Sequence, residues 1–227
     1  MAKVLVTGAG GYIGSVATYL LLQQGHEVIA IDNFSTGYKK PLEILQQKFG
    51  KDELQFSDLD LQSDISPFFK ENKGIDIVLH YAASCLVDES MKKPEKYFEN
   101  NIWGTLNLVE RMVENGISKI IFSSTAAVYG EAKQIPIPEN HPLEPINVYG
   151  ESKRMAEDII RWFGKLKGLN YVILRYFNVC GASDDGLIGD SKKPSMHLMQ
   201  NAVRGALGIE LFKLTYPEVD TPDRSPI

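Results

Sequence analysis

Short apolar runs alternate along the chain with longer stretches in which apolar residues recur at helical spacing. The apolar runs predict strands at 3–7, 27–31, 53–57, 75–80, 118–123 and 170–176. The stretches between them predict helices at roughly 12–24, 38–49, 65–72, 94–115 and 149–168. Strands that alternate with helices are typical of a parallel sheet covered on both faces, so we expect a doubly wound α/β fold.

Two segments support this prediction in detail. Residues 75–80 are nearly continuously apolar, as a strand covered on both faces should be. In the helix expected at 149–168, a period of 3.6 brings Met155, Ile159, Ile160 and Phe163 onto one stripe, which we expect to face the core.

Composition narrows the classes of partner. The 227 residues suffice for one large domain or one and a half, and a hydrophobic content of 44% is ordinary for a globular protein. A net charge of −5 without any basic block argues against nucleic acid as a partner. Cys85 and Cys180 match neither a disulfide framework nor a metal-site spacing, so we expect no metal.

The N-terminal residues bear on the cellular location that we expect for the protein. Met1-Ala2-Lys3 leads directly into a predicted core strand, and no apolar run reaches the length of a membrane span. We therefore expect no signal peptide, no membrane partner and a cytoplasmic location.

A glycine-rich turn follows the first predicted strand. Gly8, Gly11 and Gly14 are spaced by three residues, and a helical pattern begins at Tyr12. The N–H groups of a helix start bind anions, and glycines let the backbone approach a pyrophosphate closely. The next predicted strand ends in Asp32. Dinucleotide-binding folds place a carboxylate against the adenosine ribose ~20 residues after the glycine turn, which is about the position of Asp32. That carboxylate would repel a 2′-phosphate, so the pattern predicts NAD rather than NADP.

Ligands of such folds bind at the carboxyl ends of the strands. Polar and aromatic residues follow three of the predicted strands at this edge: Tyr81-Ala82-Ala83, Ser123-Ser124-Thr125 and Tyr176-Phe177-Asn178.

Tyr149 and Lys153 are four residues apart, which places both side chains on one face of the predicted helix. A nearby ammonium and a positively charged cofactor ring would lower the tyrosine pKa from about 10 toward neutrality, so that Tyr149 could act as a general base on a sugar hydroxyl. The Thr125 hydroxyl could share that hydrogen bond. Tyr129 and Lys133 have the same spacing, but Lys133 precedes a loop signature containing Pro136, whereas a good helical sequence follows Lys153.

Several longer motifs carry a family resemblance. They comprise Thr-Gly-Ala-Gly-Gly-Tyr-Ile-Gly-Ser (7–15), Asp-Asn-Phe-Ser-Thr-Gly (32–37), His-Tyr-Ala-Ala (80–83), Glu-Ser-Met-Lys-Lys-Pro (89–94), Phe-Ser-Ser-Thr-Ala-Ala-Val-Tyr-Gly (122–130), Arg-Tyr-Phe-Asn-Val-Cys-Gly-Ala (175–182) and Asp-Gly-Leu-Ile-Gly-Asp (185–190). With these motifs the chain resembles the extended short-chain dehydrogenase/reductase family from residue 3 to about 227. Within that family it is most similar to the bacterial enzymes that epimerise nucleotide sugars at C4.

The resemblance implies an isomerase that interconverts UDP-galactose and UDP-glucose by transient oxidation at the sugar C4, with NAD as a bound cofactor. Thr125, Tyr149 and Lys153 would be catalytic. The implied cofactor-binding residues are Gly8, Gly11, Tyr12, Ile13, Gly14, Asp32, Asn33, Ser35, Thr36, Gly37, Asp60, Leu61, Tyr81, Ala82, Ala83, Cys85, Asn100, Ser123, Tyr149, Lys153 and Phe177. The implied substrate-binding residues are Thr125, Tyr149, Tyr176, Asn178, His197 and Leu198.

The resemblance also implies an organisation. Residues 1–180 would form an NAD-binding Rossmann domain, and residues 181–227 the start of an incomplete nucleotide-sugar-binding domain. The partners would be a UDP-sugar and a second copy of the chain, bound through the helices near 94–115 and 149–168. Some relatives carry a lysine at the position of Cys85.

Three alternatives remain open. Nucleotide-sugar 4,6-dehydratases of the same family carry Asp-Glu directly after the threonine, where this chain has Ala126-Ala127. A decarboxylase acting on a UDP-hexuronate would need a nearby acid and an arginine that binds the carboxylate. A chain whose substrate domain is incomplete could instead be a non-catalytic NAD-binding fragment.

Overall fold

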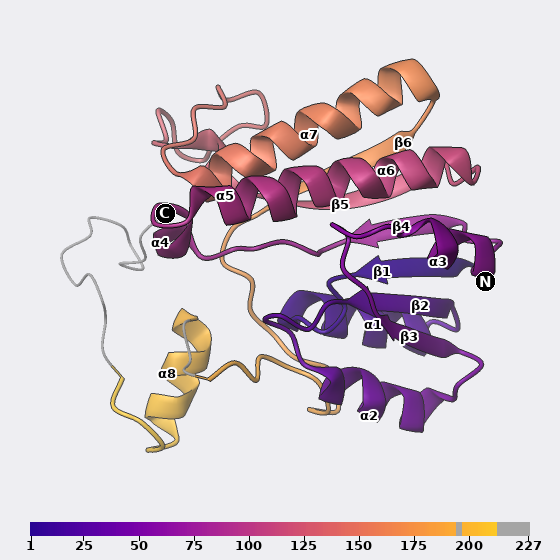
Figure 1. The fold of residues 1–227 in the computed structure, drawn as a ribbon. Coiled ribbons are helices and arrows are strands. Elements are labelled where there is room, and N and C mark those ends of the chain that lie inside the picture. Colours follow the sequence, from indigo (N-terminus) through magenta and orange to yellow (C-terminus); the bar gives the residue numbers. More distant parts are fainter. Residues whose placement is uncertain (194–196, 213–227) are drawn as a thin grey trace.

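A computed structural model describes residues 1–193 and 197–212, and its centre is one six-stranded parallel sheet (Figure 1). The strands lie in the order β3-β2-β1-β4-β5-β6. Their bounds are β1 Lys3–Thr7, β2 Glu27–Asp32, β3 Leu54–Asp58, β4 Ile77–His80, β5 Lys119–Thr125 and β6 Asn170–Tyr176. The predicted doubly wound parallel sheet is therefore confirmed.

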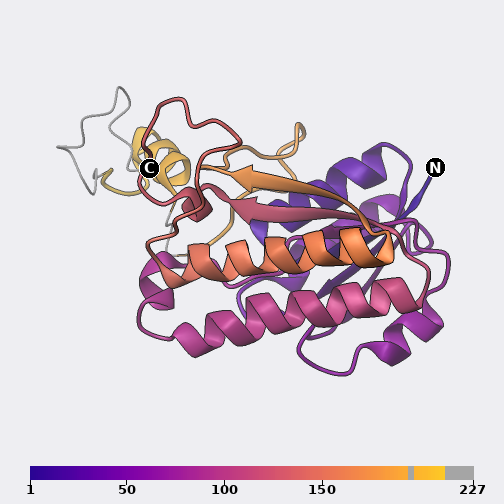
Figure 2. The same cartoon turned by 90° about the horizontal axis from the view of Figure 1, so that it is seen from above.

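Helices and helical turns connect the strands. They are α1 Tyr12–Gln23, α2 Lys39–Phe49, α3 Ser66–Glu71, α4 Val87–Ser90, α5 Pro94–Tyr97, the π-helical η1 Phe98–Trp103, α6 Gly104–Glu114, the 3₁₀ turn η2 Ala126–Tyr129, α7 Val148–Lys167 and α8 Leu198–Ala206. α6 and α7 run side by side over one part of the sheet (Figure 2).

Alternate residues of the strands build two cores, one on each face of the sheet. On one face Leu5 and Phe122 pack with apolar residues of α3, α6 and α7. On the other face Val4 and Val6 pack with those of α1 and α2. Because side chains of a strand alternate between its faces, one buried strand supplies both cores.

The order of the strands fixes where a ligand can bind. The chain runs outward from β1 to β3, and β4 then returns to the other side of β1. The connections that follow β1 and β4 therefore diverge and leave a crevice at their carboxyl ends.

Most sequence-based element bounds differ from the observed ones by one or two residues, but the helix expected at 94–115 is wrong in its interior. It consists of α5, the π-helical η1 and α6 in succession. The sequence analysis also missed α4, η2 and α8. In α7, Ile160 is buried as expected, whereas Met155 is exposed and its neighbour Ala156 takes the core position.

After β6 the chain crosses the carboxyl edge of the sheet toward α2 and continues to α8 (Figure 1). Ile188, on this crossing, is buried in the core that contains α1 and α2. Residues 213–227, the last part of the second domain expected from the sequence, lie outside the described residues. In the described part of the chain no helix is long and apolar enough to cross a membrane. Residues 1–193 and 197–212 contain no cluster of His, Cys, Asp and Glu able to hold a metal.

Candidate functional site

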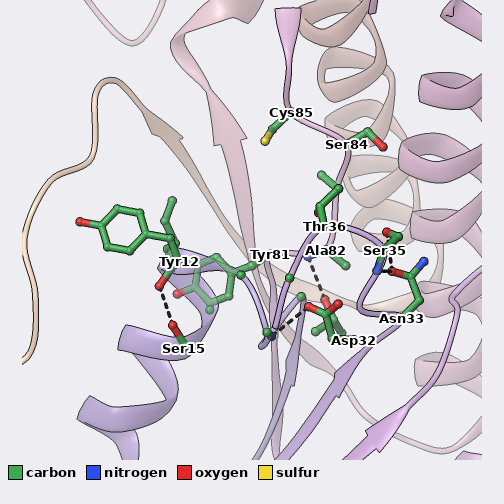
Figure 3. A pocket seen from close by; sticks show the side chains of 18 of the residues that line it. Tyr12, Ser15, Asp32, Asn33, Ser35, Thr36, Tyr81, Ala82, Ser84 and Cys85 are labelled. Carbon is green, nitrogen blue, oxygen red and sulfur yellow. Dashed lines mark hydrogen bonds between the residues drawn. The ribbon is translucent and has the colours of Figure 1, made fainter. Parts of the chain in front are cut away.

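A pocket opens at the carboxyl ends of β1, β2, β4 and β5 (Figure 3). With the exception of Phe177, every residue that the sequence analysis assigned to cofactor binding lines this pocket. These residues come from segments up to about 145 positions apart in the chain, from Gly8 to Lys153. The fold thus brings the separate motifs of the sequence to one surface.

The three positions of the turn differ in how much space they leave for a side chain. A Cβ on Gly8, which has a positive φ of 69°, would lie 2.5 Å from the Ala82 nitrogen, and one on Gly14 would lie 2.2 Å from the Gly8 oxygen. At Gly11 the nearest protein atom would be the Gly8 oxygen at 3.3 Å. The fold itself therefore needs Gly8 and Gly14, whereas Gly11 leaves open space on the pocket side.

Gly11 is also the N-cap of α1, and none of the described side chains caps that helix. The first N–H groups of α1, which include those of Tyr12 and Ile13, therefore keep their capacity to donate to an anion. This arrangement fits the pyrophosphate of a dinucleotide.

Asp32, at the end of β2, joins the glycine turn to the following loop. Its Oδ2 accepts from the Gly10 N–H at 2.9 Å and its Oδ1 from the Phe34 N–H at 2.7 Å. Burial raises the pKa of this carboxyl, although both N–H groups oppose that effect. Each oxygen retains a lone pair, so the carboxylate can still accept from the hydroxyls of a ribose.

Beside Asp32, Asn33 donates to the Asp60 carboxylate at 3.0 Å and accepts from Ser35. Leu61 follows Asp60 on the same wall, and its carbonyl accepts from Asn107. These contacts hold together the two loops that flank the end of the pocket near β2 and β3.

Tyr149 and Lys153 reach the pocket from the first turns of α7. Burial raises the pKa of Tyr149 to about 12, and a hydrogen bond from the Thr125 side chain opposes that rise. Thr125 itself caps η2, since its Oγ1 accepts from the Ala127 N–H at 3.1 Å. The sequence analysis expected Lys153 to lower the tyrosine pKa, but burial dominates in the chain alone.

Lys153 is buried, and its Nζ donates to the carbonyl oxygen of Ser123 at 2.7 Å. The ammonium also lies 4.7 Å from the centre of the Phe122 ring. Burial lowers the pKa of Lys153 to about 8, while the neighbouring Cys85 and Glu157 oppose that effect. A bound anion or polar ligand would favour the protonated form.

A buried chain of hydrogen bonds runs behind the pocket. Thr105 donates to the Asn101 carbonyl at 2.6 Å, so its oxygen accepts from His80 Nε2 at 2.9 Å. The other nitrogen of His80, Nδ1, then accepts a hydrogen bond from the Thr7 hydroxyl at 2.7 Å. The oxygen of that hydroxyl accepts in turn from the Ala82 N–H at 3.3 Å. The neutral Nε2–H tautomer of His80 satisfies every partner in this chain.

Burial, assisted by the positive charge of Lys153, lowers the pKa of His80 to about 3. The imidazole is therefore neutral at physiological pH. It holds the backbone after β4, where Ala82 and Ala83 line the pocket.

The π-helical η1 places neighbouring asparagines in different roles. Asn100 lines the pocket, whereas the Asn101 side chain is buried. Asn101 bonds both backbone groups of Ser84 and donates to Ser152 Oγ at 2.9 Å. It thereby ties the loop that carries Cys85 to α7.

Two residues that the sequence analysis assigned to the substrate, Tyr149 and His197, line the pocket. His197 Nδ1 lies 2.6 Å from the Asp190 carboxylate, and its ring is near that of Tyr12. Tyr176 lies beside the pocket and accepts a hydrogen bond from Tyr81.

Thr125 adjoins Tyr149 but does not line the pocket. The remaining assigned residues, Phe177, Asn178 and Leu198, are exposed and also lie outside the lining.

The sequence analysis missed part of the wall. Gly10 contacts the ring of Phe34, and a Cβ there would lie 2.9 Å from it. Residues 189–192 also line the pocket, because the crossing after β6 passes over it. The motif at 185–190 was a signal for this second set, although only the fold shows which surface it covers.

The profile of the NAD dependent epimerase/dehydratase family matches residues 4–216. Among curated proteins, the UDP-glucose 4-epimerase of Lactobacillus helveticus is 42% identical over 222 residues, which make up 97% of this chain and 65% of that protein. UDP-arabinose 4-epimerase 1 of Arabidopsis thaliana is 42% identical over 86% of this chain and 47% of its own length. The chain therefore spans about 65% or less of the length of these two relatives.

Solved structures agree with these similarities. The UDP-glucose 4-epimerase from Bifidobacterium longum in complex with NAD⁺ and UDP has a TM-score of 0.89 and 36% identity, covering 99% of this chain and 68% of that one. The UDP-glucose 4-epimerase from Brucella ovis in complex with NAD has a TM-score of 0.86 and 35% identity, covering 98% and 66%.

Proposed function

The chain belongs to the NAD dependent epimerase/dehydratase family, and on that basis we propose that it binds NAD and interconverts UDP-galactose and UDP-glucose. The observation that carries the proposal is the position of Tyr149 and Lys153 at the wall of a pocket that begins at the glycine turn. The two relatives with bound NAD have the same fold.

The residues present fit NAD. The uncapped start of α1 and the open side of Gly11 suit the pyrophosphate, and Asp32 suits the adenosine ribose. Lys153 would contact the nicotinamide ribose at the other end of the pocket. When bound, NAD supplies reversible oxidation at the sugar C4.

Tyr149 would take the proton from the sugar C4 hydroxyl and later return it. Because burial raises its pKa to about 12, the phenolate needs positive charge nearby when substrate is bound. Lys153 supplies such a charge from one helical turn away, and Thr125 donates to the tyrosine oxygen and stabilises the phenolate.

The nucleotide sugar would extend from Tyr149 toward the crossing after β6. Tyr176, Asn178, His197 and Leu198 are the proposed contacts there, of which His197 lines the pocket. The Asp190 carboxylate holds His197 Nδ1 and so orients the ring.

A second copy of the chain would complete a homodimer through α6 and α7. The two helices lie side by side on one face (Figure 2), and Met155, Trp162 and Leu166 expose apolar side chains on α7. Burying such a surface is favourable and would provide the core of an interface.

The residues after Thr125 disfavour a 4,6-dehydratase. Ala126 and Ala127 form the start of η2 and carry only methyl groups where elimination of water would need an acid and a base. A decarboxylase of the same family is the remaining enzymatic alternative, and a non-catalytic NAD-binding fragment is the alternative of a different class.

The test is conversion of UDP-galactose to UDP-glucose by the purified chain without added NAD. We expect turnover, and we expect Tyr149→Phe to reduce it roughly 10²- to 10⁴-fold while NADH binding persists. Tyr171→Phe, on the exposed side of β6, is the matched control and should retain full activity. Folded protein that binds NADH but has no turnover would contradict the epimerase and leave the non-catalytic alternative.

A further inference from the structure

Glu157 is a fully buried carboxylate on α7 with four hydrogen-bond donors. Ser124 Oγ donates to its Oε1 at 2.5 Å, and Arg175 donates Nε to Oε1 at 3.0 Å and NH2 to Oε2 at 2.8 Å. Arg161 donates to Oε2 at 2.7 Å. Burial alone would raise the pKa of Glu157, but the donors, above all Arg175 and Ser124, hold it below its usual value.

These contacts connect elements that are distant in sequence. Arg175 comes from β6, and Ser124 from the neighbouring register position on β5. Arg175 also donates to the Tyr129 hydroxyl at 3.0 Å in η2 and to the Glu139 carbonyl at 3.3 Å in the following loop. One carboxylate therefore connects, directly or through Arg175, the end of η2, the ends of two strands and the middle of α7.

Glu157 lies directly behind the proposed catalytic residues. It is one helical turn after Lys153 and two turns after Tyr149. Its partner Ser124 stands between Ser123, whose carbonyl accepts from Lys153, and Thr125, whose side chain donates to Tyr149. A shift of Ser124 would therefore move both contacts at once.

The charge of Glu157 also acts on Lys153. Cys85 and the neutral His80 lie near Lys153, and its ammonium donates to the neutral carbonyl of Ser123. The negative charge of Glu157 raises the pKa of Lys153 and thereby opposes the effect of burial. Arg175 and Arg161 form ion pairs with Glu157 and keep it ionised.

We infer that Glu157, through Ser124 and Arg175, is a positioning residue that holds the end of β5 against α7 and places its negative charge one helical turn from Lys153. This role rests on the proposed function of Lys153 and Thr125. In this role the buried carboxylate of Glu157 acts through its neighbours and contacts neither cofactor nor substrate.

The experiment compares Glu157→Gln and Ser124→Ala with the parent chain. Glu157→Gln removes the negative charge and keeps the shape of the side chain. Ser124→Ala removes the hydrogen bond between β5 and Glu157 and keeps the charge of Glu157. For each folded variant, NADH is titrated by fluorescence from pH 6.5 to 9.5, and kcat and KM are measured for UDP-galactose. Glu151→Gln is the matched control, since it removes a partly exposed carboxylate from the same helix.

For Glu157→Gln we expect the pH at which NADH affinity declines to fall by about one unit, because Lys153 loses its proton more readily. For Ser124→Ala that pH should not change, but kcat should fall roughly 10- to 100-fold with little effect on KM, because Thr125 is displaced. Glu151→Gln should match the parent in both measurements.

An unchanged pH midpoint in folded Glu157→Gln would overturn the effect on Lys153, and an unchanged kcat in Ser124→Ala would overturn the positioning of Thr125. If Glu157→Gln does not fold, Arg175→Lys serves instead; it should lower kcat, and a parent-like kcat would count against the inference. The two proposals fail separately. A parent chain without turnover contradicts the epimerase, whereas the NADH midpoints still decide the role of Glu157.

Discussion

The ammonium of Lys153, on α7, donates to the carbonyl oxygen of Ser123, on β5, at 2.7 Å. This bond holds the lysine at the pocket wall, one helical turn from Tyr149. Because the acceptor is neutral, burial dominates and lowers the lysine pKa to about 8.

Lys153→Met should therefore weaken NADH binding most strongly below pH 8, where the parent lysine carries its charge. We expect an affinity loss of roughly tenfold or more at pH 7, since a charged hydrogen bond contributes about 1.5–3 kcal/mol. Fluorescence titrations at pH 7 and pH 9.5 test this expectation. A loss of equal size at both pH values would mean that the charge of Lys153 plays no part.

Gly11→Ala and Gly14→Ala should separate binding from folding. Alanine at 11 meets protein only at 3.3 Å, so the chain should fold but bind NADH at least tenfold more weakly, because the methyl group occupies the pyrophosphate position. Alanine at 14 would lie 2.2 Å from the Gly8 oxygen, so we expect a loss of about 1–3 kcal/mol in the free energy of unfolding. Urea unfolding and NADH titration of both variants check the contrast, and equal effects of the two variants would contradict it.

Asp32→Ala should weaken NADH binding more than NADPH binding, because the carboxylate contacts the ribose and repels a 2′-phosphate. It should also reduce stability by about 1–3 kcal/mol, since the Gly10 and Phe34 N–H groups lose their acceptor. Asp58→Ala is a suitable control, because Asp58 is the neighbouring register position on β3 and forms an exposed ion pair with Lys39. An unchanged ratio of NADH to NADPH affinity would refute the assignment of Asp32.

His80 should make the fold sensitive to acid. Its pKa is about 3 in the folded chain against 6.5 when unfolded, so the unfolded state binds the extra proton between these values. Stability from this group is complete above pH 6.5 and is lost as the pH falls toward 3. The slope should reach about 1.4 kcal/mol per pH unit.

His80→Gln should reduce stability at pH 7 and flatten that slope in urea unfolding series at pH 7, 6 and 5. Thr105→Val, which removes the acceptor for His80 Nε2 and keeps the imidazole, should reduce stability and retain the slope. A slope that survives in His80→Gln would assign the acid sensitivity to other groups.

Trp162→Glu on α7 should convert the proposed homodimer to a monomer, because it places a charge in an apolar interface. Sedimentation velocity measures the change. Ile135→Glu, at an exposed position in the loop after η2, should leave the assembly unchanged. A monomeric parent chain would contradict the homodimer directly.

The sequence by itself determined the parallel sheet, the glycine turn and the pairing of Tyr149 with Lys153, and it predicted part of the pocket lining but not Gly10 or residues 189–192. These features depend on patterns within short segments, namely apolar runs, glycine spacing and the spacing of Tyr149 and Lys153. Such patterns can be recognised without knowing which segments pack against each other. The position of the site followed because parallel strands place their carboxyl ends at one edge.

The tertiary structure alone decided which groups meet across the chain. The π-helical turn at Asn101, the neutral tautomer of His80 and the wall formed by residues 189–192 depend on partners 17 or more positions away, which no local period encodes. The charge environment was decided in the same way. Burial raised the pKa of Tyr149 where spacing had suggested a lower one, because desolvation depends on everything packed around the group.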